Sequence, residues 1–274
     1  MIVFPNCKIN LGLNILRKRE DGFHDLETVF YPIHFNDALE VITNSSSEPG
    51  AEFVMTGLKI DGSATDNLCV KAYGLLKKDF PQLPAIKIHL HKTIPTGAGL
   101  GGGSADAAFM LKLLNEKFHL NLSTSQLINY SLKLGSDCPF FILNKPCFAT
   151  GRGEKLEEIQ LDLSAYQVML INPHIHINTG WAFSQINPAL PEKSVKEIIR
   201  QPISTWKGEL KNDFEEAVFA AHPSIKSIKE DLYNQGAVYA SMSGSGSTVF
   251  GIFDKAVSSI TVKNGNDYFT KIIN

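Results

Sequence analysis

The sequence contains few cysteines, and none of them are closely paired. Its 274 residues include four cysteines that lie far apart, namely Cys7, Cys69, Cys138 and Cys147. Zinc ribbons and dithiol redox centres depend on Cys-x-x-Cys pairs, so this spacing argues against both kinds of site. We expect the four thiols to be reduced and to serve as small core side chains.

Long apolar runs and blocks of basic residues are also missing. No apolar stretch approaches the roughly 20 residues that a membrane-spanning helix needs. The first residues lack the basic, apolar and cleavage regions of a secretory signal. The 26 basic and 28 acidic residues give a formal net charge of −2. This pattern argues against nucleic acids and membranes as partners and predicts a cytoplasmic protein.

The N-terminal segment 6–16 alternates apolar and polar residues with a period of two. Cys7, Ile9 and the following odd positions are apolar, which is typical of a strand with one buried face. Lys8 and Asn10 share the other face, about 7 Å apart along the strand. From this segment alone, we expect that face to be solvated.

The rest of the chain mixes strand and helix patterns, and we expect an α+β protein with a domain boundary near residue 155. The expected domains are residues 1–155 and 156–274. Alternation predicts the strands, helical periodicity predicts the helices, and turn residues mark their ends. Strands are predicted over 38–43, 52–56, 85–91, 147–150, 166–172, 237–242 and 248–253, and helices over 67–79, 104–118, 123–135, 179–186, 193–200, 210–221 and 223–235.

The segment 97–103 concentrates five glycines in seven residues between a predicted strand and a predicted helix. Glycine weakens regular structure but lets backbone N–H groups approach an anion without interference from a Cβ atom. The start of the following helix adds unpaired N–H groups and a positive dipole end. We therefore predict a phosphate-binding loop rather than a hinge.

A dinucleotide site is one alternative for this loop. Gly97, Gly99 and Gly102 satisfy the pattern G-x-G-x-x-G, but that fingerprint also needs an acidic residue about 20 positions further on. No Asp or Glu occurs between Glu116 and Asp137, and the loop lies about 95 residues into the chain. The sequence context therefore argues against a dinucleotide site.

A Walker-type loop is the other alternative. Gly102 and Ser104 fit G-x-x-x-x-G-K-[ST], but Gly103 stands where the lysine belongs. The phosphate charge must then be met by the helix dipole, a metal ion and side chains from elsewhere. Lys8 and Lys92 are the candidates for the missing cation.

Residues 95–108, Pro-Thr-Gly-Ala-Gly-Leu-Gly-Gly-Gly-Ser-Ala-Asp-Ala-Ala, resemble the phosphate loop of the GHMP kinase family, which includes galactokinase, homoserine kinase and mevalonate kinase. Further matching motifs occur in order along essentially the whole chain. They are Cys-Lys-Ile-Asn-Leu at 7–11, Asp-Gly-Phe-His at 21–24, Asp-Asn-Leu at 66–68, Gly-Ser-Asp-Cys-Pro-Phe-Phe at 135–141, Gly-Arg-Gly-Glu at 151–154 and Gly-Ser-Gly-Ser at 244–247.

The resemblance implies a two-domain α+β fold with the active site between the domains. The N-terminal domain would be ribosomal-S5-domain-2-like α/β and carry the phosphate loop, and the C-terminal domain would be ferredoxin-like α+β. The implied cofactors are ATP and Mg²⁺, with Ser104 near the metal ion. The implied nucleotide contacts are Asn67, Lys92, Pro95, Gly97, Ala98, Gly99, Leu100, Gly101, Gly102, Gly103 and Ser104.

The resemblance also implies a catalytic pair and an acceptor site. Asp137 would accept the proton of the acceptor hydroxyl, and Lys8 would pair with it. A buried carboxylate and a buried lysine each need a partner, which makes this pairing physically sensible. The implied acceptor contacts are Asn10, Phe23, His24, Asp137 and Phe183, with His24 contacting a cytosine edge and the two Phe rings stacking on the cytosine faces.

The closest resemblance is to family members that phosphorylate the 2-hydroxyl of a cytidine-diphosphate-linked methylerythritol, a polyol of the non-mevalonate isoprenoid route. The implied assembly is a monomer or a weak homodimer. Phe23 stands where tyrosine is common, Cys138 replaces an aliphatic residue, and Arg152 replaces a small apolar one. Because of Arg152, the resemblance does not determine the detailed shape of the diphosphate pocket.

Three other functions remain as alternatives. The first is another kinase of the same family, such as a homoserine or mevalonate kinase, whose acceptors have no base for Phe23 and His24. The second is a non-catalytic nucleotide-binding protein, against which the retained Lys8 and Asp137 argue. A dinucleotide-dependent oxidoreductase is a distant third.

Overall fold

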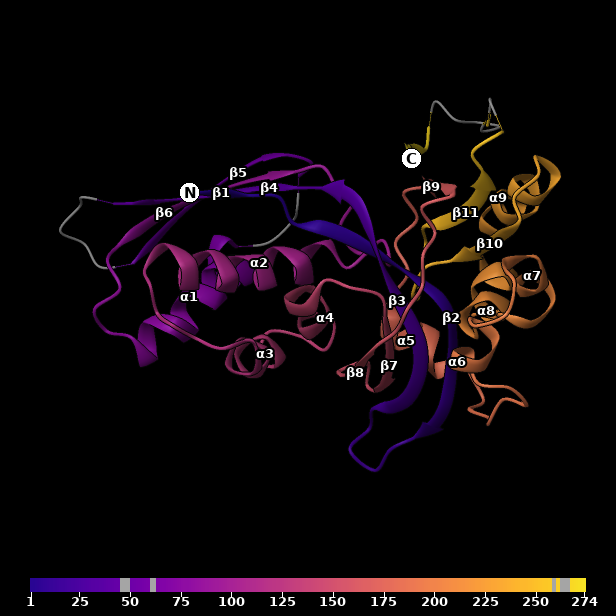
Figure 1. Cartoon of the computed structure of the whole chain (residues 1–274), viewed down its shortest axis with the longest axis horizontal. Helices are drawn as coiled ribbons and strands as arrows, with labels where there is room; N and C mark the ends of the chain where they lie inside the picture. The colour runs from indigo at the N-terminus through magenta and orange to yellow at the C-terminus, as the bar shows by residue number, and fades with distance from the viewer. Residues whose placement is uncertain (45–49, 60–62, 258–259, 262–266) are drawn as a thin grey trace. The chain divides into compact units, whose positions relative to one another are not determined.

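The computed structural model describes residues 1–44, 50–59, 63–257, 260–261 and 267–274. They form two compact units (Figure 1). The first unit comprises Met1–Cys7, His34–Thr96 and Gly101–Lys145, and the second comprises Lys8–Ile33, Gly97–Leu100 and Pro146–Asn274. The compact units thus divide the glycine loop between them, and the predicted domain boundary near residue 155 stays a prediction.

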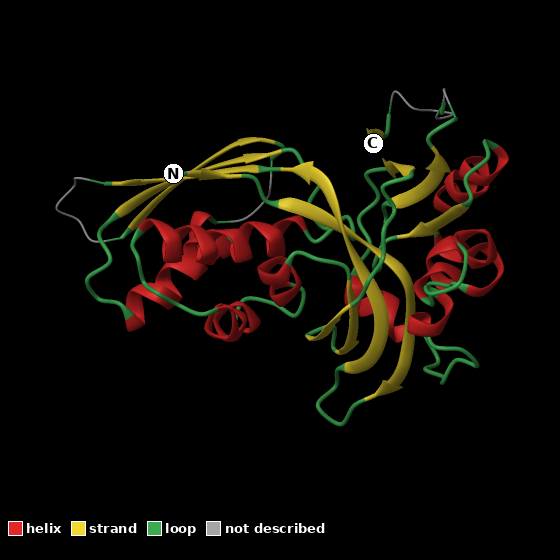
Figure 2. Cartoon of the chain, in the orientation of Figure 1, coloured by secondary structure: helices red, strands yellow, loops and turns green. Residues whose placement is uncertain are grey.

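The first unit is a four-stranded sheet with helices on one of its faces (Figure 2). The strand order is β1-β4-β6-β5, in which β5 runs parallel to β6 and the other pairs are antiparallel. Helices α1 and α2 pack against each other, as do α2 and α4. The elements are β1 (Ile2–Val3), β4 (Ala38–Thr43), β5 (Ala51–Gly57), β6 (Ile86–Lys92), the 3₁₀ helix η1 (Ala64–Asp66), α1 (Leu68–Asp79), α2 (Gly102–Lys117), α3 (Thr124–Leu132) and α4 (Cys138–Leu143).

The second unit contains two four-stranded sheets, ordered β2-β3-β7-β8 and β10-β11-β9-β12. Helix α9 packs on β10 and β11 and lies beside α8 (Figure 1). The strands are β2 (Asn6–Lys18), β3 (His24–Asn36), β7 (Cys147–Gly151), β8 (Lys155–Glu158), β9 (Tyr166–Asn172), β10 (Tyr239–Met242), β11 (Val249–Asp254) and β12 (Phe269–Ile273). The helices are α5 (Thr179–Ser184), α6 (Val195–Ile198), η2 (Ile203–Thr205), α7 (Trp206–Glu209), α8 (Phe214–Ala221) and α9 (Pro223–Asn234).

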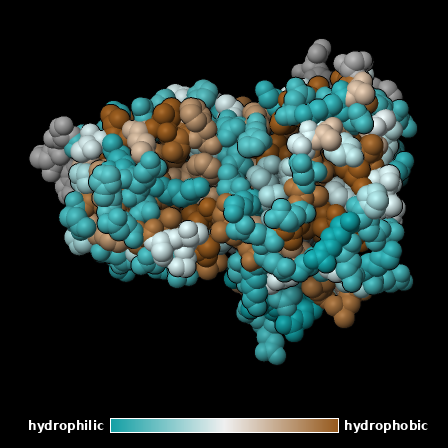
Figure 3. Space-filling view, in the orientation of Figure 1, coloured by the Kyte–Doolittle hydropathy of each residue, from teal (hydrophilic) through white to brown (hydrophobic). Residues whose placement is uncertain are grey.

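Each unit buries its own apolar side chains. In the first unit, the odd–even alternation of β6 buries Ile86, Ile88 and Leu90 and leaves the intervening residues more exposed. In the second, Leu13 and Ile15 of β2 pack with the apolar residues of β9, α8, α9 and β11. Figure 3 shows hydrophobic and hydrophilic side chains interspersed on the displayed face of both units. Burial of the four cysteines, all of them free thiols, confirms the prediction for them.

Most of the predicted elements are present, and the strand over residues 6–16 is confirmed as part of β2. The expectation that one face of this strand is solvated was wrong, because Lys8 and Asn10 are as buried as the apolar residues between them. Strand β3 was not predicted, since Pro32 and a charged beginning interrupt any alternation. In the described ranges, no helix is long and apolar enough to cross a membrane.

Candidate active site

The apex of the glycine loop is held by a lysine and a serine of the second unit. The carbonyl oxygen of Gly99 accepts hydrogen bonds from Nζ of Lys8 at 3.0 Å and from Oγ of Ser243 at 2.8 Å. Gly99 has a positive φ of 78°, and a Cβ atom there would lie 1.9 Å from the carbonyl oxygen of Ser243. Only glycine fits this position, because both the conformation and the contact exclude a side chain.

Backbone hydrogen bonds on both sides of Gly99 extend this attachment. The N–H group of Lys8 donates to the carbonyl of Leu100 at 3.0 Å, and the N–H group of Thr248 donates to the carbonyl of Ala98 at 3.2 Å. Residues 98–100 are therefore hydrogen-bonded to β2 on one side and to the segment that follows β10 on the other. This arrangement places the Gly-Ser-Gly-Ser motif at 244–247 beside the phosphate loop.

Lys8 and Asn10 form a buried polar network at the same place. Nζ of Lys8 donates to Oδ1 of Asn10 at 2.6 Å, and Nδ2 of Asn10 donates to Oγ1 of Thr28 at 3.0 Å. The ammonium group also lies 5.2 Å from the centre of the Phe30 ring. A lysine has three N–H donors and no acceptor, so these contacts direct its charge toward the loop apex.

An aromatic pair, made of His24 and Phe183, lies in the second unit, and Phe23 precedes His24 in the sequence. The rings of His24 and Phe183 stack with centroids 4.7 Å apart and planes 15° apart. Phe183 in turn makes an edge contact with Phe214. Burial lowers the pKa of His24 below 6.5, with a further lowering by Lys18, so the imidazole is neutral near pH 7.

Phe23 is half exposed, and the guanidinium group of Arg152 lies over its ring. The guanidinium carbon of Arg152 lies 3.5 Å from the ring centre, which makes this a cation–π contact. The sequence predicted Phe23 and Phe183 on the two faces of a cytosine. In the structure, Phe183 stacks on His24 and Arg152 stacks on Phe23, so the stacking of both rings on a base stays a prediction.

The N-terminus of α2 supplies the other half of the phosphate loop, in the first unit. Gly101 is the N-cap residue in the left-handed conformation, with φ of 70°, and no side chain caps the helix. The first-turn N–H groups of Gly102, Gly103 and Ser104 therefore have no capping side chain. Such a helix start suits an anionic ligand.

Ser104 and Cys138, the residue after Asp137, are brought together in the first unit by the packing of α2 on α4. The thiol of Cys138, which follows Asp137, is hydrogen-bonded to the Ser104 side chain, and burial raises the pKa of that thiol to about 12. Asp137 is the N-cap residue of α4, but its side chain makes no capping bond. The predicted pairing of Asp137 with Lys8 joins residues of different units and stays a prediction.

The hydroxyl oxygen of Ser104 fits magnesium. Mg²⁺ prefers hard oxygen ligands, keeps several waters and usually binds through one or two protein oxygens together with phosphate groups. The Ser104 hydroxyl, in the first turn of α2, provides one such oxygen. Within the described residues, no group of three or more His, Cys, Asp or Glu side chains could hold a metal ion on its own.

Two predicted nucleotide contacts have other partners in the structure. Oδ1 of Asn67 caps α1 by accepting from the N–H group of Cys69 at 2.9 Å. Lys92 is fully buried, and its ammonium group is paired with Asp37 and Asp106. Their contacts with a nucleotide, like that of Pro95, stay predictions.

Three residues around the loop were not predicted from the sequence. Ser243 directly precedes the Gly-Ser-Gly-Ser motif, and that position could have drawn attention to it. His176 lies against the loop, since a Cβ atom at Gly97 would be 3.6 Å from its Nδ1 atom. Thr28, which bonds to Asn10, lies in the unpredicted strand β3. No local pattern in the sequence points to His176 or Thr28.

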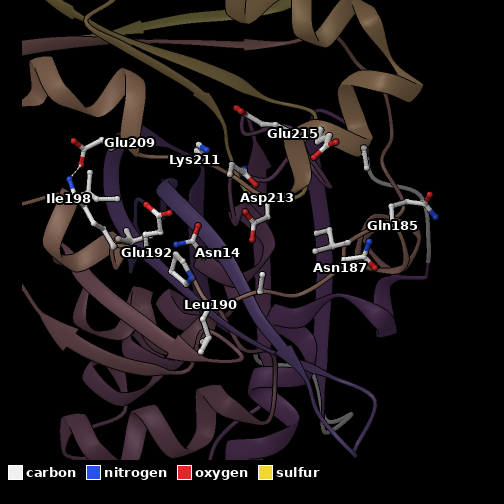
Figure 4. Close-up of a pocket in the computed structure, with 18 of the residues that line it drawn as sticks. Asn14, Gln185, Asn187, Leu190, Glu192, Ile198, Glu209, Lys211, Asp213 and Glu215 are labelled. Carbon is white, nitrogen blue, oxygen red and sulfur yellow. Dashed lines mark hydrogen bonds and ion pairs between the residues drawn. The ribbon is translucent and has the colours of Figure 1, made fainter.

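A separate cavity of about 1020 Å³ also lies in the second unit (Figure 4). Its lining includes the carboxylates Glu192, Asp213 and Glu215, and burial raises the pKa of Asp213. It contains none of the predicted nucleotide or acceptor contacts. An acidic lining repels phosphate groups, so we place neither ATP nor a diphosphate there.

Comparison with known proteins agrees with the geometry of the loop. The family model for the GHMP kinases N terminal domain matches residues 67–145, and the model for the GHMP kinases C terminal domain matches residues 194–267. The chain belongs to the GHMP kinase family. The predicted family and the predicted two-domain GHMP kinase fold are thereby confirmed.

Similar GHMP kinases are known from several bacteria. The chain is 56% identical over 253 residues to the 4-diphosphocytidyl-2-C-methyl-D-erythritol kinase of Bacteroides fragilis, covering 92% of each chain. It is 51% identical to the protein of that name from Parabacteroides distasonis, covering 93% of this chain and 92% of that one.

Solved structures show the same fold. The crystal structure of a 4-(cytidine 5'-diphospho)-2C-methyl-D-erythritol kinase superposes with a TM-score of 0.79 at 31% identity, covering 92% of this chain and 90% of that one. Mevalonate kinase from Methanococcus jannaschii gives a TM-score of 0.70 at 13% identity, covering 100% and 96%. The second likeness concerns the fold alone.

Proposed function

We propose that this GHMP kinase transfers the terminal phosphoryl group of ATP to the 2-hydroxyl of 4-diphosphocytidyl-2-C-methyl-D-erythritol, a step of non-mevalonate isoprenoid precursor synthesis. The observation that carries the proposal is the combination, within one unit, of the Lys8–Asn10–Gly99 network with the stacked His24–Phe183 pair. Relatives that align over nine-tenths of the chain carry the name of this kinase. Because ATP is the phosphoryl donor, we place the reaction in the cytoplasm.

The glycine loop and the start of α2 bind the phosphates of ATP in this proposal. Backbone N–H groups near Gly101–Gly103 donate to phosphate oxygens, which compensates for the missing Walker lysine. Mg²⁺ would be held by Ser104 together with the phosphates, and it would neutralise part of the phosphate charge. Lys8 adds a fixed positive charge at Gly99, where its contacts hold it.

Asp137 acts as the proton acceptor for the hydroxyl of the second substrate. Asp137 stands at the N-terminus of α4, and an ionised carboxylate accepts hydrogen bonds only. Phosphoryl transfer passes through a loose transition state in which little nucleophile activation is needed. Positioning of the hydroxyl by Asp137 therefore contributes more than the basicity of the carboxylate.

His24 recognises the cytosine of the second substrate. A neutral imidazole carries one N–H donor and one acceptor nitrogen, which suits the mixed donor and acceptor edge of a pyrimidine. The ring contact with Phe183 fixes the plane of the imidazole, so its edge points in a defined direction. Phe23 offers a half-exposed aromatic face next to it.

A substrate panel tests the proposal directly. ADP release would be measured with ATP and one acceptor at a time: the cytidine-linked polyol, homoserine or mevalonate. We expect turnover with the cytidine compound alone and a large rise of its KM in His24→Ala. Turnover with homoserine or mevalonate but not with the cytidine compound would refute the proposed acceptor.

A further inference from the structure

Three ionisable side chains are buried together at the start of α2, where the phosphate loop ends. The ammonium group of Lys92 forms ion pairs with Asp37 and, at 2.8 Å, with Asp106. All three side chains are almost completely buried, and all three lie in the first unit. We call these residues the Lys92 cluster.

Stability alone is a poor reason for such a cluster. Removing charges from water is costly, and well-packed apolar residues often stabilise a core as well as a buried ion pair does. In addition, Oδ1 of Asp106 is buried without a hydrogen-bond partner among the described residues. A buried acceptor without a partner is a cost to folding, so the cluster needs another explanation.

The cluster contacts the chain where it enters the loop. Oδ1 of Asp37 accepts from the N–H group of Thr93 at 2.6 Å and from that of Ile94 at 2.9 Å, while Oδ2 pairs with Lys92. Thr93 and Ile94 connect the end of β6 to the first loop residues. Asp37 therefore fixes the position from which the loop starts.

The cluster also contacts the chain where it leaves the loop. Asp106 lies one turn beyond Gly102, the first residue of α2. A Cβ atom at Gly102 would lie 3.3 Å from Nζ of Lys92 and 2.9 Å from Cγ2 of Ile94. The start of α2 thus rests directly on the ammonium group and on the entry residue Ile94.

We propose that the Lys92 cluster positions the two ends of the phosphate loop relative to each other, and that Lys92 is a positioning residue rather than a nucleotide contact. The ammonium group joins a carboxylate that holds the loop entry to a carboxylate on the helix that forms the loop exit. The inference rests on the proposed binding of ATP at this loop. It assigns a role to Asp37 and Asp106 as well as to Lys92.

The test uses a double-mutant cycle between Gly102→Ala and Lys92→Met. The dissociation constant of a non-hydrolysable ATP analogue and the melting temperature would be measured for each variant. We expect Gly102→Ala to weaken binding about tenfold or more, because misplacement of a binding group by about 1 Å is costly. In the Lys92→Met background the same substitution should weaken binding less, since the shorter Met side chain leaves room for the new methyl group.

Two further variants separate positioning from stability. Asp106→Asn keeps the size of the side chain and should weaken ATP binding several-fold while leaving the KM of the acceptor unchanged. Lys229→Met breaks the Lys229–Glu215 ion pair of the second unit, which is 2.6 Å long, and serves as a matched control. We expect it to lower the melting temperature without changing ATP binding.

Two outcomes would overturn the inference. Lower melting temperatures with unchanged ATP binding in all cluster variants would show a structural role only. A loss of binding confined to Lys92→Met, with Gly102→Ala and Asp106→Asn like the wild type, would show that Lys92 contacts the nucleotide itself. Because the readout is ATP binding, the result does not depend on which acceptor the enzyme phosphorylates.

Discussion

The hydroxyl group of Ser243 donates a hydrogen bond of 2.8 Å to the carbonyl oxygen of Gly99, from a position 144 residues further along the chain. This bond joins the phosphate loop to the segment that precedes the Gly-Ser-Gly-Ser motif. The two backbones approach so closely that a single methyl group on Gly99 would overlap the Ser243 carbonyl. The loop apex therefore depends on residues from three distant parts of the chain.

Gly99→Ala should disrupt this apex. The substitution adds strain at positive φ and a clash with a backbone oxygen, for which we expect a loss of about 2 kcal/mol or more in the free energy of unfolding. We also expect kcat/KM for ATP to fall about 100-fold or more. Urea denaturation and steady-state kinetics measure the two effects.

Gly74→Ala is the matched control for that substitution. Gly74 lies in α1 with open space around its Cα atom and no positive φ. Alanine should raise the free energy of unfolding by about 0.5–1 kcal/mol and leave the kinetics unchanged. If Gly99→Ala behaved like this control, the described packing of the apex would be wrong.

The recognition of the acceptor should depend on pH through His24. Burial lowers its pKa below 6.5, so the neutral form dominates at higher pH and the KM of the acceptor should be constant from about pH 6.5 to 8. The same shift means that the unfolded chain takes up the proton first as the pH falls. The contribution of His24 to stability is therefore complete above pH 6.5 and is lost as the pH falls through the pKa of the folded state.

An NMR titration of the His24 ring protons measures this pKa. His24→Gln, which keeps hydrogen-bonding groups but cannot be protonated, is the control and should remove the pH dependence of the acceptor KM at low pH. A measured pKa above 6.5, or an acceptor KM that changes steeply between pH 6.5 and 8, would contradict the assigned environment.

Arg152 should contribute to binding of the diphosphate. Its guanidinium lies over the ring of Phe23, which holds the group in place next to the expected base site. Charge-assisted hydrogen bonds contribute roughly 1.5–3 kcal/mol, so Arg152→Met should raise the acceptor KM about 10- to 100-fold. The KM of ATP should not change.

Arg152→Lys distinguishes the charge from the stacking. Lysine keeps the positive charge but loses the planar fork, and we expect an intermediate KM that increases with salt concentration. An unchanged acceptor KM in both variants would show that Arg152 covers Phe23 without contacting the substrate.

Asp137→Asn tests the proposed proton acceptor. The substitution preserves size and should leave the melting temperature and ATP binding near those of the wild type. Loss of a general base typically costs about 10²- to 10⁴-fold, so kcat should fall in that range. The measurement is single-turnover phosphoryl transfer, and a rate near that of the wild type would remove Asp137 from this role.

The sequence predicted local features of the fold well. Alternation identified β2 and β6, and the capping-box residues Ser123 and Gln126 marked the start of α3, where both capping hydrogen bonds are present. Such features depend on residues within a few positions of each other. Strand β3 escaped prediction because Pro32 interrupts its pattern and its stability comes from neighbouring strands.

Long-range partners could not be predicted from the sequence. Lys8 and Asn10 were expected on a solvated face, yet their face is covered by Thr28, Gly99 and Ser243, which are 18 to 233 residues away from Asn10 or Lys8. Likewise, nothing near Lys92 in the sequence indicates that Asp37 pairs with it. The family resemblance supplied the site residues, and the structure supplied the neighbours that constrain them.

The most direct test of the account is the chemical identity of the product. Wild-type protein would be incubated with ATP and 4-diphosphocytidyl-2-C-methyl-D-erythritol, and the product would be examined by mass spectrometry and ³¹P NMR. We predict one added phosphate on the 2-hydroxyl, formed together with an equal amount of ADP. Recovery of the unmodified acceptor, or a phosphate on a different hydroxyl, would contradict the account.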